Sequence, residues 1–185
     1  MRDVAPDFVV DSRNQNMLSA IYNYCWRREG KLDPNKGLLL FGPIGTGKST
    51  LMKGLQRYFG KINHYAYSFN RDDLGFRFTS AVEISLTYGK KGLDGLSDLI
   101  DASSMTNLAI DEIGKETTES KHFGNNLNVI QTILQLRYEA RYKCVTHATT
   151  NLNPNTDFGR LYGDYIADRC KEMFNVIEVG GDSRR

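Results

Sequence analysis

Eight consecutive residues constrain what this chain can fold into more than any other feature of the sequence. They read Gly-Pro-Ile-Gly-Thr-Gly-Lys-Ser from Gly42 to Ser49 and satisfy the pattern GxxxxGK[ST]. An apolar run at 37–41 precedes them and an amphipathic segment at 48–58 follows, which predicts a strand, a loop and a helix in that order. Glycines allow a backbone to wrap around phosphate groups, and the N-terminus of the following helix attracts their negative charge. We therefore expect a phosphate-binding loop here.

This loop assigns roles to individual side chains. Lys48 is expected to contact the β- and γ-phosphates, and Ser49 to bind magnesium through its hydroxyl group. The predicted nucleotide-binding residues are Gly42, Pro43, Ile44, Gly45, Thr46, Gly47, Lys48, Ser49 and Thr50.

An acidic pair follows about sixty residues later. The apolar run 108–110 ends in Asp111 and Glu112, and two carboxylates at the tip of a buried strand need a cation. Asp111 therefore suits the magnesium shell, while Glu112 is predicted to accept a proton from an attacking water. Together with the loop, the pair makes hydrolysis of ATP with Mg²⁺ the leading expectation.

Composition excludes several other classes of protein. A chain of 185 residues with 40% hydrophobic and 25% charged residues has the length and content of one ordinary domain. Its longest apolar run, 38–41, is too short to span a bilayer, and early acidic residues argue against a secretory signal, so we expect a cytoplasmic protein without membrane association. The three cysteines are scattered, which argues against a disulfide framework and a structural zinc site. A net charge of +2 falls short of that of an obligate nucleic-acid binder.

Strand and helix signals alternate along the chain. Predicted strands lie at 37–41, 64–69, 107–111, 144–149 and 176–179. Predicted helices lie at 12–29, 48–58, 126–142 and 160–173, with two more inside 71–105 that break around 89–92. This order predicts a three-layer α/β/α domain with a mostly parallel five-stranded sheet. We expect a core at 36–185 and a short helical N-terminal extension at 1–35.

With these motifs the sequence resembles the P-loop NTPases of the AAA+ type, and among them the DnaC/DnaI-type helicase loaders and the related IstB-type transposition helper ATPases. The resemblance runs from about residue 36 to residue 185 and includes Thr149-Thr150-Asn151-Leu152-Asn153, which looks like the family's sensor 1. It implies that Asn151 orients the lytic water or contacts the γ-phosphate. The block 163–170 is similar to the loader segment that carries an arginine finger, which makes Arg169 the candidate finger. Tyr165 stands where many relatives carry a first arginine.

The resemblance also bears on the end of the chain and on subunit contacts. The chain stops where a helical lid begins in many AAA+ proteins, so no C-terminal lid is expected. Arg184 is a candidate sensor 2 residue, with a solvated basic terminus as the alternative. Arg137, on the helix before the sensor strand, is a candidate for a subunit interface.

The partners implied by the resemblance are single-stranded DNA, a replicative helicase and further copies of the chain at the nucleotide interface. Cations and aromatic rings between the second and third strands are the candidate DNA contacts, and the alternative is a charged loop over an aromatic core. These candidates are Arg71, Arg77, Lys90 and Lys91, with Phe76, Phe78 and Tyr88 beside them. Only about 35 residues precede the core, whereas loaders usually carry a larger N-terminal domain that grips the helicase.

Three alternatives stay open beside a DnaC-like loader. A helper ATPase that delivers DNA to a transposase shares every catalytic residue, so only the partner distinguishes it. A small-molecule kinase also uses such a loop, but the adjacent acidic pair favours water activation. A nucleotide-dependent binding module would show negligible turnover. A GTPase is disfavoured, because 151–154 is a poor match to the guanine-specifying NKxD motif.

Overall fold

The computed structural model describes residues 8–66, 74–116, 120–122 and 125–181. Its strands are β1 (Gly37–Phe41), β2 (Arg77–Ser80), β3 (Leu108–Ile113), β4 (Ser120–His122), β5 (Asn125–Leu127), β6 (Thr146–Thr150) and β7 (Phe174–Glu178). Its helices are α1 (Gln15–Cys25), α2 (Lys48–Ala66), α3 (Ala81–Lys91), the 3₁₀ turn η2 (Leu93–Leu96), α4 (Ser97–Ile100), α5 (Val129–Glu139), α6 (Pro154–Tyr162) and α7 (Asp164–Met173).

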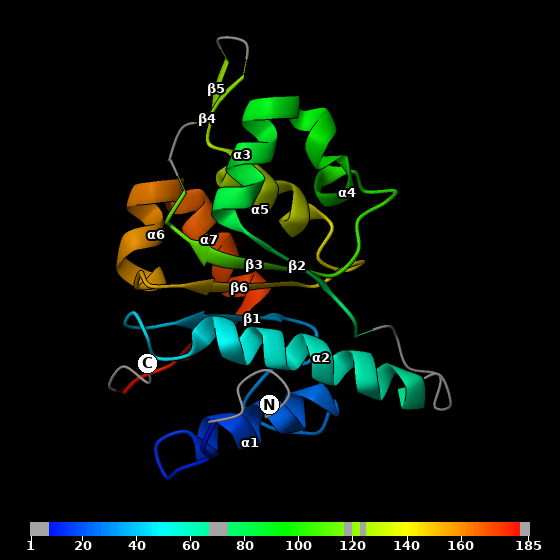
Figure 1. Ribbon diagram of the computed structural model, residues 1–185, viewed down its shortest axis with the longest axis vertical. Coiled ribbons are helices and arrows are strands. Elements are labelled where there is room, and N and C mark those ends of the chain that lie inside the picture. Colours follow the sequence, from blue (N-terminus) through cyan, green and yellow to red (C-terminus); the bar gives the residue numbers. More distant parts are fainter. Residues whose placement is uncertain (1–7, 67–73, 117–119, 123–124, 182–185) are drawn as a thin grey trace.

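Five strands form one sheet in the order β2-β3-β6-β1-β7, and every neighbouring pair is parallel. Helices α1 and α2 cover one face of this sheet, and α3 to α7 cover the other (Figure 1). The predicted three-layer α/β/α fold with a parallel five-stranded sheet is therefore confirmed. The carboxyl ends of β1, β3 and β6 meet at one edge because the strands are parallel, and this edge carries the predicted site residues.

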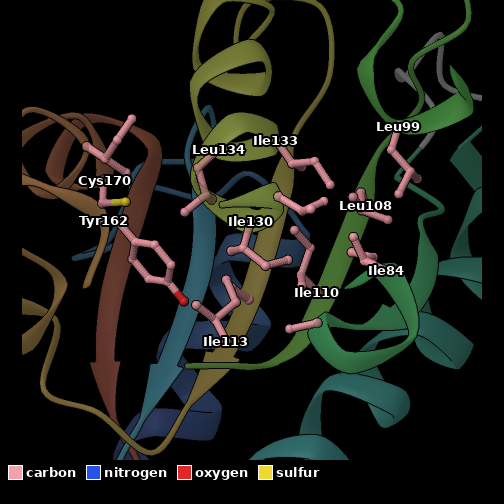
Figure 2. Packing of buried hydrophobic residues seen from close by; sticks show 14 of the residues in the cluster. Ile84, Leu99, Leu108, Ile110, Ile113, Ile130, Ile133, Leu134, Tyr162 and Cys170 are labelled. Atoms are coloured by element: carbon pink, nitrogen blue, oxygen red, sulfur yellow. The ribbon is translucent and has the colours of Figure 1, made fainter. Parts of the chain in front are cut away.

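Strand alternation divides the apolar residues between two cores. In β1, Leu38 and Leu40 pack with α1 and α2, whereas Leu39 faces the other helices. Figure 2 shows the larger core, in which Ile130 and Ile133 of α5 lie over Ile110 of β3. Side chains of α1 share the smaller core with α2. The three inner strands β1, β3 and β6 are thus buried on both faces, as expected of a parallel sheet.

Two element predictions are wrong, and one pair of strands was not predicted. The segment 64–66, which begins the strand expected at 64–69, continues α2, while 67–69 lie outside the described residues; the second strand is β2, at Arg77–Ser80. The predicted helix 160–173 is two helices, because Gly163 takes a φ of 82° between α6 and α7. Strands β4 and β5 pair antiparallel outside the main sheet. The predicted break around 89–92 is present, since α3 ends at Lys91 and Gly92 is its C-cap. No helix in the described parts of the chain is long and apolar enough to cross a membrane.

Candidate nucleotide-binding site

The predicted phosphate loop lies at the carboxyl end of β1 and leads directly into α2, which begins at Lys48. Its glycines Gly42, Gly45 and Gly47 all have positive φ, a conformation that L side chains rarely adopt. The loop borders a cavity of about 470 Å³. Lining this cavity are Ile44, Gly45, Thr46, Gly47, Lys48, Ser49 and Thr50, together with Glu112, Asn151, Phe8, Val9, Asp11 and Arg13. The structure therefore brings most of the predicted loop together with two predicted catalytic residues.

Lys48 is 6% exposed and is held by the loop itself. Its Nζ donates hydrogen bonds to the carbonyl oxygens of Gly42 at 2.7 Å and Pro43 at 2.6 Å. Burial lowers the pKa of Lys48 from its ordinary value, while the carboxylates of Glu112 and Asp111 oppose that shift. A buried ammonium bonded to neutral carbonyls gains strongly from an anion at the same place. Lys48 is thus positioned to exchange these carbonyls for phosphate oxygens.

A short chain of hydrogen bonds links the loop to the acidic pair. Ser49 Oγ donates to Asp111 Oδ1 at 2.8 Å, and Thr149 Oγ1 donates to the same oxygen at 2.5 Å. The Thr149 hydroxyl in turn accepts the backbone N–H of Glu112 at 2.9 Å. Thr149 is fully buried in β6, so it holds the tips of β3 and β6 together.

Ser49 and Asp111 fit a magnesium ion. Mg²⁺ binds hard oxygen ligands and usually takes one or two from the protein, with phosphates and water completing the shell. Asp111 Oδ1 and Ser49 Oγ supply two such oxygens within hydrogen-bond distance of each other. Among the described residues, no cluster of three or more His, Cys, Asp or Glu side chains could hold a metal ion alone. Ser49 and Asp111 therefore suit a Mg²⁺ ion whose remaining ligands are phosphate oxygens and water.

Glu112 has an unusual backbone. Its φ is 59°, a left-handed conformation that costs a non-glycine residue on the order of 1–3 kcal/mol. The hydrogen bond from its N–H to Thr149 is part of what maintains this conformation. Its carboxylate forms an ion pair with Lys115, with Nζ and Oε1 2.5 Å apart. The residue in this strained conformation lines the cavity beside the phosphate loop.

Sequence reasoning missed two contributors to the site. Thr149 was noted inside the sensor motif without a role, although its hydroxyl bridges Asp111 and Glu112. The N-terminal segment, represented by Phe8 and Val9, lines the cavity and adds apolar surface to it. No motif marks that segment, since a long-range contact of this kind leaves no periodic signal in the sequence.

The candidate arginine finger lies away from the cavity, on α7. The guanidinium carbon of Arg169 lies 4.1 Å from the ring centre of Tyr138 and 3.7 Å from that of Tyr165. Aromatic rings therefore cover both faces of its guanidinium. One of the two rings belongs to Tyr165, which lies four residues before Arg169 on the same helix.

The expectation that Arg137 faces a subunit interface is wrong. The side chain is 0% exposed and is bonded inside the protein. Its Nε donates to Thr146 Oγ1 at 2.7 Å, and its Nη2 donates to the carbonyl oxygen of Thr106 at 2.7 Å. Arg137 is thus a structural residue that joins α5 to the amino end of β6.

Of the three aromatic rings among the candidate DNA contacts, two are buried, and the third, Phe78, is partly buried with Lys53 over its ring. Phe76 and Tyr88 are buried in two different cores, so neither ring is available to a base. Arg77 is exposed and forms an ion pair with Asp98 at 3.1 Å. Lys90 and Lys91 are exposed in the last turn of α3. Two further predicted residues, Arg71 and Arg184, lie outside the described residues.

Known structures share this architecture. The fold is similar to that of the DnaC helicase loader, with a TM-score of 0.63 and 16% identity over 96% of this chain and 96% of that one. It is similar to that of DnaI, with a TM-score of 0.61 and 20% identity over 100% of this chain and 94% of that one. AMPPCP-bound DnaA from Aquifex aeolicus gives a TM-score of 0.55 and 16% identity over 96% of this chain and 50% of that one. At these identities the likeness concerns the fold.

Sequence families add a more specific result. No curated protein matches the sequence. The family described as the ATPase family associated with various cellular activities (AAA) matches residues 38–171. That range contains the phosphate loop, the acidic pair, the sensor segment and Arg169. The chain therefore belongs to the AAA family of ATPases.

Proposed function

We propose that this protein is a Mg²⁺-dependent ATPase that acts in DNA replication as a DnaC-like helicase loader on single-stranded DNA. The observation that carries the ATPase part is the hydrogen-bonded chain from Ser49 through Asp111 and Thr149 to Glu112, beside the phosphate loop. The loader part is supported by the likeness to DnaC and DnaI, which extends over nearly the full length of this chain and of both structures.

The site residues divide the chemistry among them. Lys48 binds the β- and γ-phosphates in place of the loop carbonyls that it contacts in this structure. Ser49 and Asp111 would hold Mg²⁺, which would neutralise phosphate charge when bound. Glu112 accepts one proton from water, whose oxygen attacks the γ-phosphorus as the bond to the leaving ADP oxygen breaks. Asn151, at the cavity wall, orients that water or contacts the γ-phosphate.

Arg169 completes the site from a neighbouring copy in this proposal. Its faces are covered by Tyr138 and Tyr165, which leaves the in-plane edge of its guanidinium group to contact a phosphate. Where measured in GTPases, such a finger contributes on the order of 10³–10⁵ in rate. Turnover per protomer should therefore rise with protein concentration.

The nucleotide site is tested with two substitutions and one matched control. Lys48→Ala should weaken binding of a fluorescent ATP analogue at least about 10-fold, because a charged hydrogen-bond donor is lost. Glu112→Gln should bind it as the wild type does while phosphate release falls roughly 10²- to 10⁴-fold. Lys53→Ala is the control, since Lys53 lies on the same helix but stacks on Phe78. Equal affinity of Lys48→Ala and Lys53→Ala would refute the assignment of the loop.

The proposed arginine finger is tested by mixing two variants. Arg169→Ala should bind nucleotide normally but hydrolyse it slowly, and mixing it with Glu112→Gln should restore part of the turnover. Recovery requires that one chain supplies Arg169 and its neighbour supplies Glu112. No recovery at any mixing ratio would refute a finger that acts between copies. A separate measurement distinguishes hydrolysis from small-molecule kinase activity. An ATPase releases inorganic phosphate from ATP when no small-molecule phosphate acceptor is added, whereas a kinase requires that acceptor.

A further inference from the structure

Five side chains on α5, α7 and the turn after α5 form one continuous stack, which we call the cation–aromatic ladder. In order, they are Tyr142, Arg141, Tyr138, Arg169 and Tyr165. The guanidinium carbon of Arg141 lies 4.3 Å from the ring centre of Tyr142 and 4.0 Å from that of Tyr138. Arg169 continues the stack between Tyr138 and Tyr165. Rings and guanidinium groups thus alternate without interruption.

Both ends of the ladder are open to solvent. Tyr142 is 88% exposed and Tyr165 is 59% exposed. A ring that is 88% exposed gains almost no hydrophobic free energy from folding, so Tyr142 contributes little to stability. The turn nevertheless holds it in place, because Arg141 donates from Nη2 to the Tyr142 hydroxyl at 2.8 Å and from Nη1 to the carbonyl oxygen of Tyr138 at 3.0 Å. Tyr142 is therefore a positioned aromatic surface with one face left to a ligand.

The Tyr142 end of the ladder borders a cavity of about 820 Å³. Gly37, Asn107 and Thr146 line this cavity, and they lie at the amino ends of β1, β3 and β6. It is consequently at the opposite edge of the sheet from the nucleotide site. Its volume is within the range of about 300–1,000 Å³ that is usual for small-ligand sites.

Charge at this cavity favours an anion. Four cationic side chains line it, against the carboxylates of Asp33 and Glu172. Glu172 lies 3.7 Å from Arg141 and accepts a hydrogen bond from Tyr138, so it also supports the ladder. The four cations are Arg27, Lys36, Arg141 and Lys143. In the ladder, Arg169 Nη1 is buried and has no hydrogen-bond partner among the residues that the structure describes.

We infer that the Tyr142 end of the ladder and the adjoining cavity bind single-stranded DNA, a surface that extends the proposed function and rests on it. Single-stranded DNA binds where bases stack on aromatic side chains while cations contact the backbone phosphates. Tyr142 offers the stacking face, and Arg141, Lys143 and Arg27 line the adjoining cavity with positive charge. A duplex has no unpaired base to stack there, so the surface should discriminate against it.

The test measures fluorescence anisotropy of a labelled oligothymidylate with the full chain and ATP. Tyr142→Ala should raise the Kd roughly 5- to 100-fold, the loss expected for one stacked base, while Tyr142→Phe stays within about 3-fold of the wild type. Tyr22→Ala removes another exposed tyrosine, on α1, and should leave the Kd unchanged. The melting temperature of Tyr142→Ala should stay within about 2 °C of the wild type, because the side chain is exposed.

Three outcomes decide between the inference and the proposed function. If the wild type and Tyr142→Ala bind single-stranded DNA equally well, the role of the ladder in DNA binding is refuted while the loader proposal stands. If the wild type binds no single-stranded DNA with ATP present, the inference and the DNA part of the proposed function are both refuted, and ATP hydrolysis stands on its own test. If duplex of equal length binds as tightly and shows the same loss in Tyr142→Ala, base stacking is refuted as the cause.

Discussion

Replacing Thr149 with valine tests whether the hydroxyl group of Thr149 positions Asp111 and Glu112. Valine keeps the shape of the side chain and removes the one oxygen that links both residues. The N–H of Glu112 then loses its acceptor, and Asp111 Oδ1 loses one of its two donors. Asp111 keeps the hydrogen bond from Ser49, so the magnesium ligands are disturbed less than Glu112.

The size of the effect follows from these contacts. An unsatisfied buried donor costs about 1–3 kcal/mol, and a hydrogen bond to a carboxylate contributes on the order of 1.5–3 kcal/mol. Relaxation of the strained backbone at Glu112 returns part of that loss. We expect the free energy of unfolding to fall by about 2 kcal/mol, which corresponds to a decrease in Tm of roughly 4–8 °C. Because Glu112 is no longer held in its left-handed conformation, kcat should fall at least about 10-fold.

The assay pairs denaturant unfolding with single-turnover hydrolysis, and Thr146→Val is the matched control. Thr146 lies at the other end of β6 and accepts a hydrogen bond from Arg137, so its loss costs stability without contact with Asp111 or Glu112. Thr149→Val should show nucleotide affinity within about 3-fold of the wild type and a slow chemical step, whereas Thr146→Val should show normal kcat. An equal kcat in both variants would refute the positioning role of Thr149.

Two further predictions concern stability. Burial, followed by the charge of Arg137, lowers the pKa of His147 from 6.5 to about 3, so unfolding takes up a proton between those pH values. The stability that this residue contributes is complete above about pH 6.5 and falls as the pH drops. Between pH 7 and pH 5, the free energy of unfolding should therefore fall by about 2 kcal/mol more in the wild type than in His147→Gln. Parallel pH profiles of the two proteins would contradict this prediction. Gly37→Ala should give no folded protein, because the added Cβ would lie 1.6 Å from the carbonyl oxygen of Thr146, whereas Gly60→Ala in α2 should raise stability by about 1 kcal/mol. Circular dichroism and thermal melting distinguish these outcomes, and a soluble, cooperatively melting Gly37→Ala would show that the strand spacing adapts.

The fold was predictable from local patterns wherever a strand is apolar on both faces. The apolar runs at β1 and β3 are such strands. The phosphate loop motif in addition marks the end of β1 and the start of α2. The edge strand β2 is different, because only one neighbour pairs with it and only Thr79 of its four residues is buried. One local signal for it exists: Ser80 caps α3 by accepting the N–H of Glu83, a serine–glutamate spacing that marks a helix start and therefore a strand end.

The site was predictable as a set of residues but not as a geometry. The positions of Lys48, Ser49 and Asp111 follow from motif spacing, and their side chains lie together as that spacing implies. The left-handed backbone of Glu112 and its bond to Thr149 depend on the register between β3 and β6, which shifts between Ile110 and Ile113. The stack around Arg169 depends on the angle at which α5 and α7 pack, which no sequence pattern encodes.

The strand order has a consequence for how this protein is made. The strand that leads into the phosphate loop, β1, pairs only with β6 and β7, which are synthesised more than a hundred residues after it. A ribosome therefore releases the apolar β1 segment long before either partner exists, and closing such distant pairs is slow. Until β6 and β7 have emerged, the apolar side chains of β1 lack their strand partners, and exposed apolar surface of this kind favours aggregation.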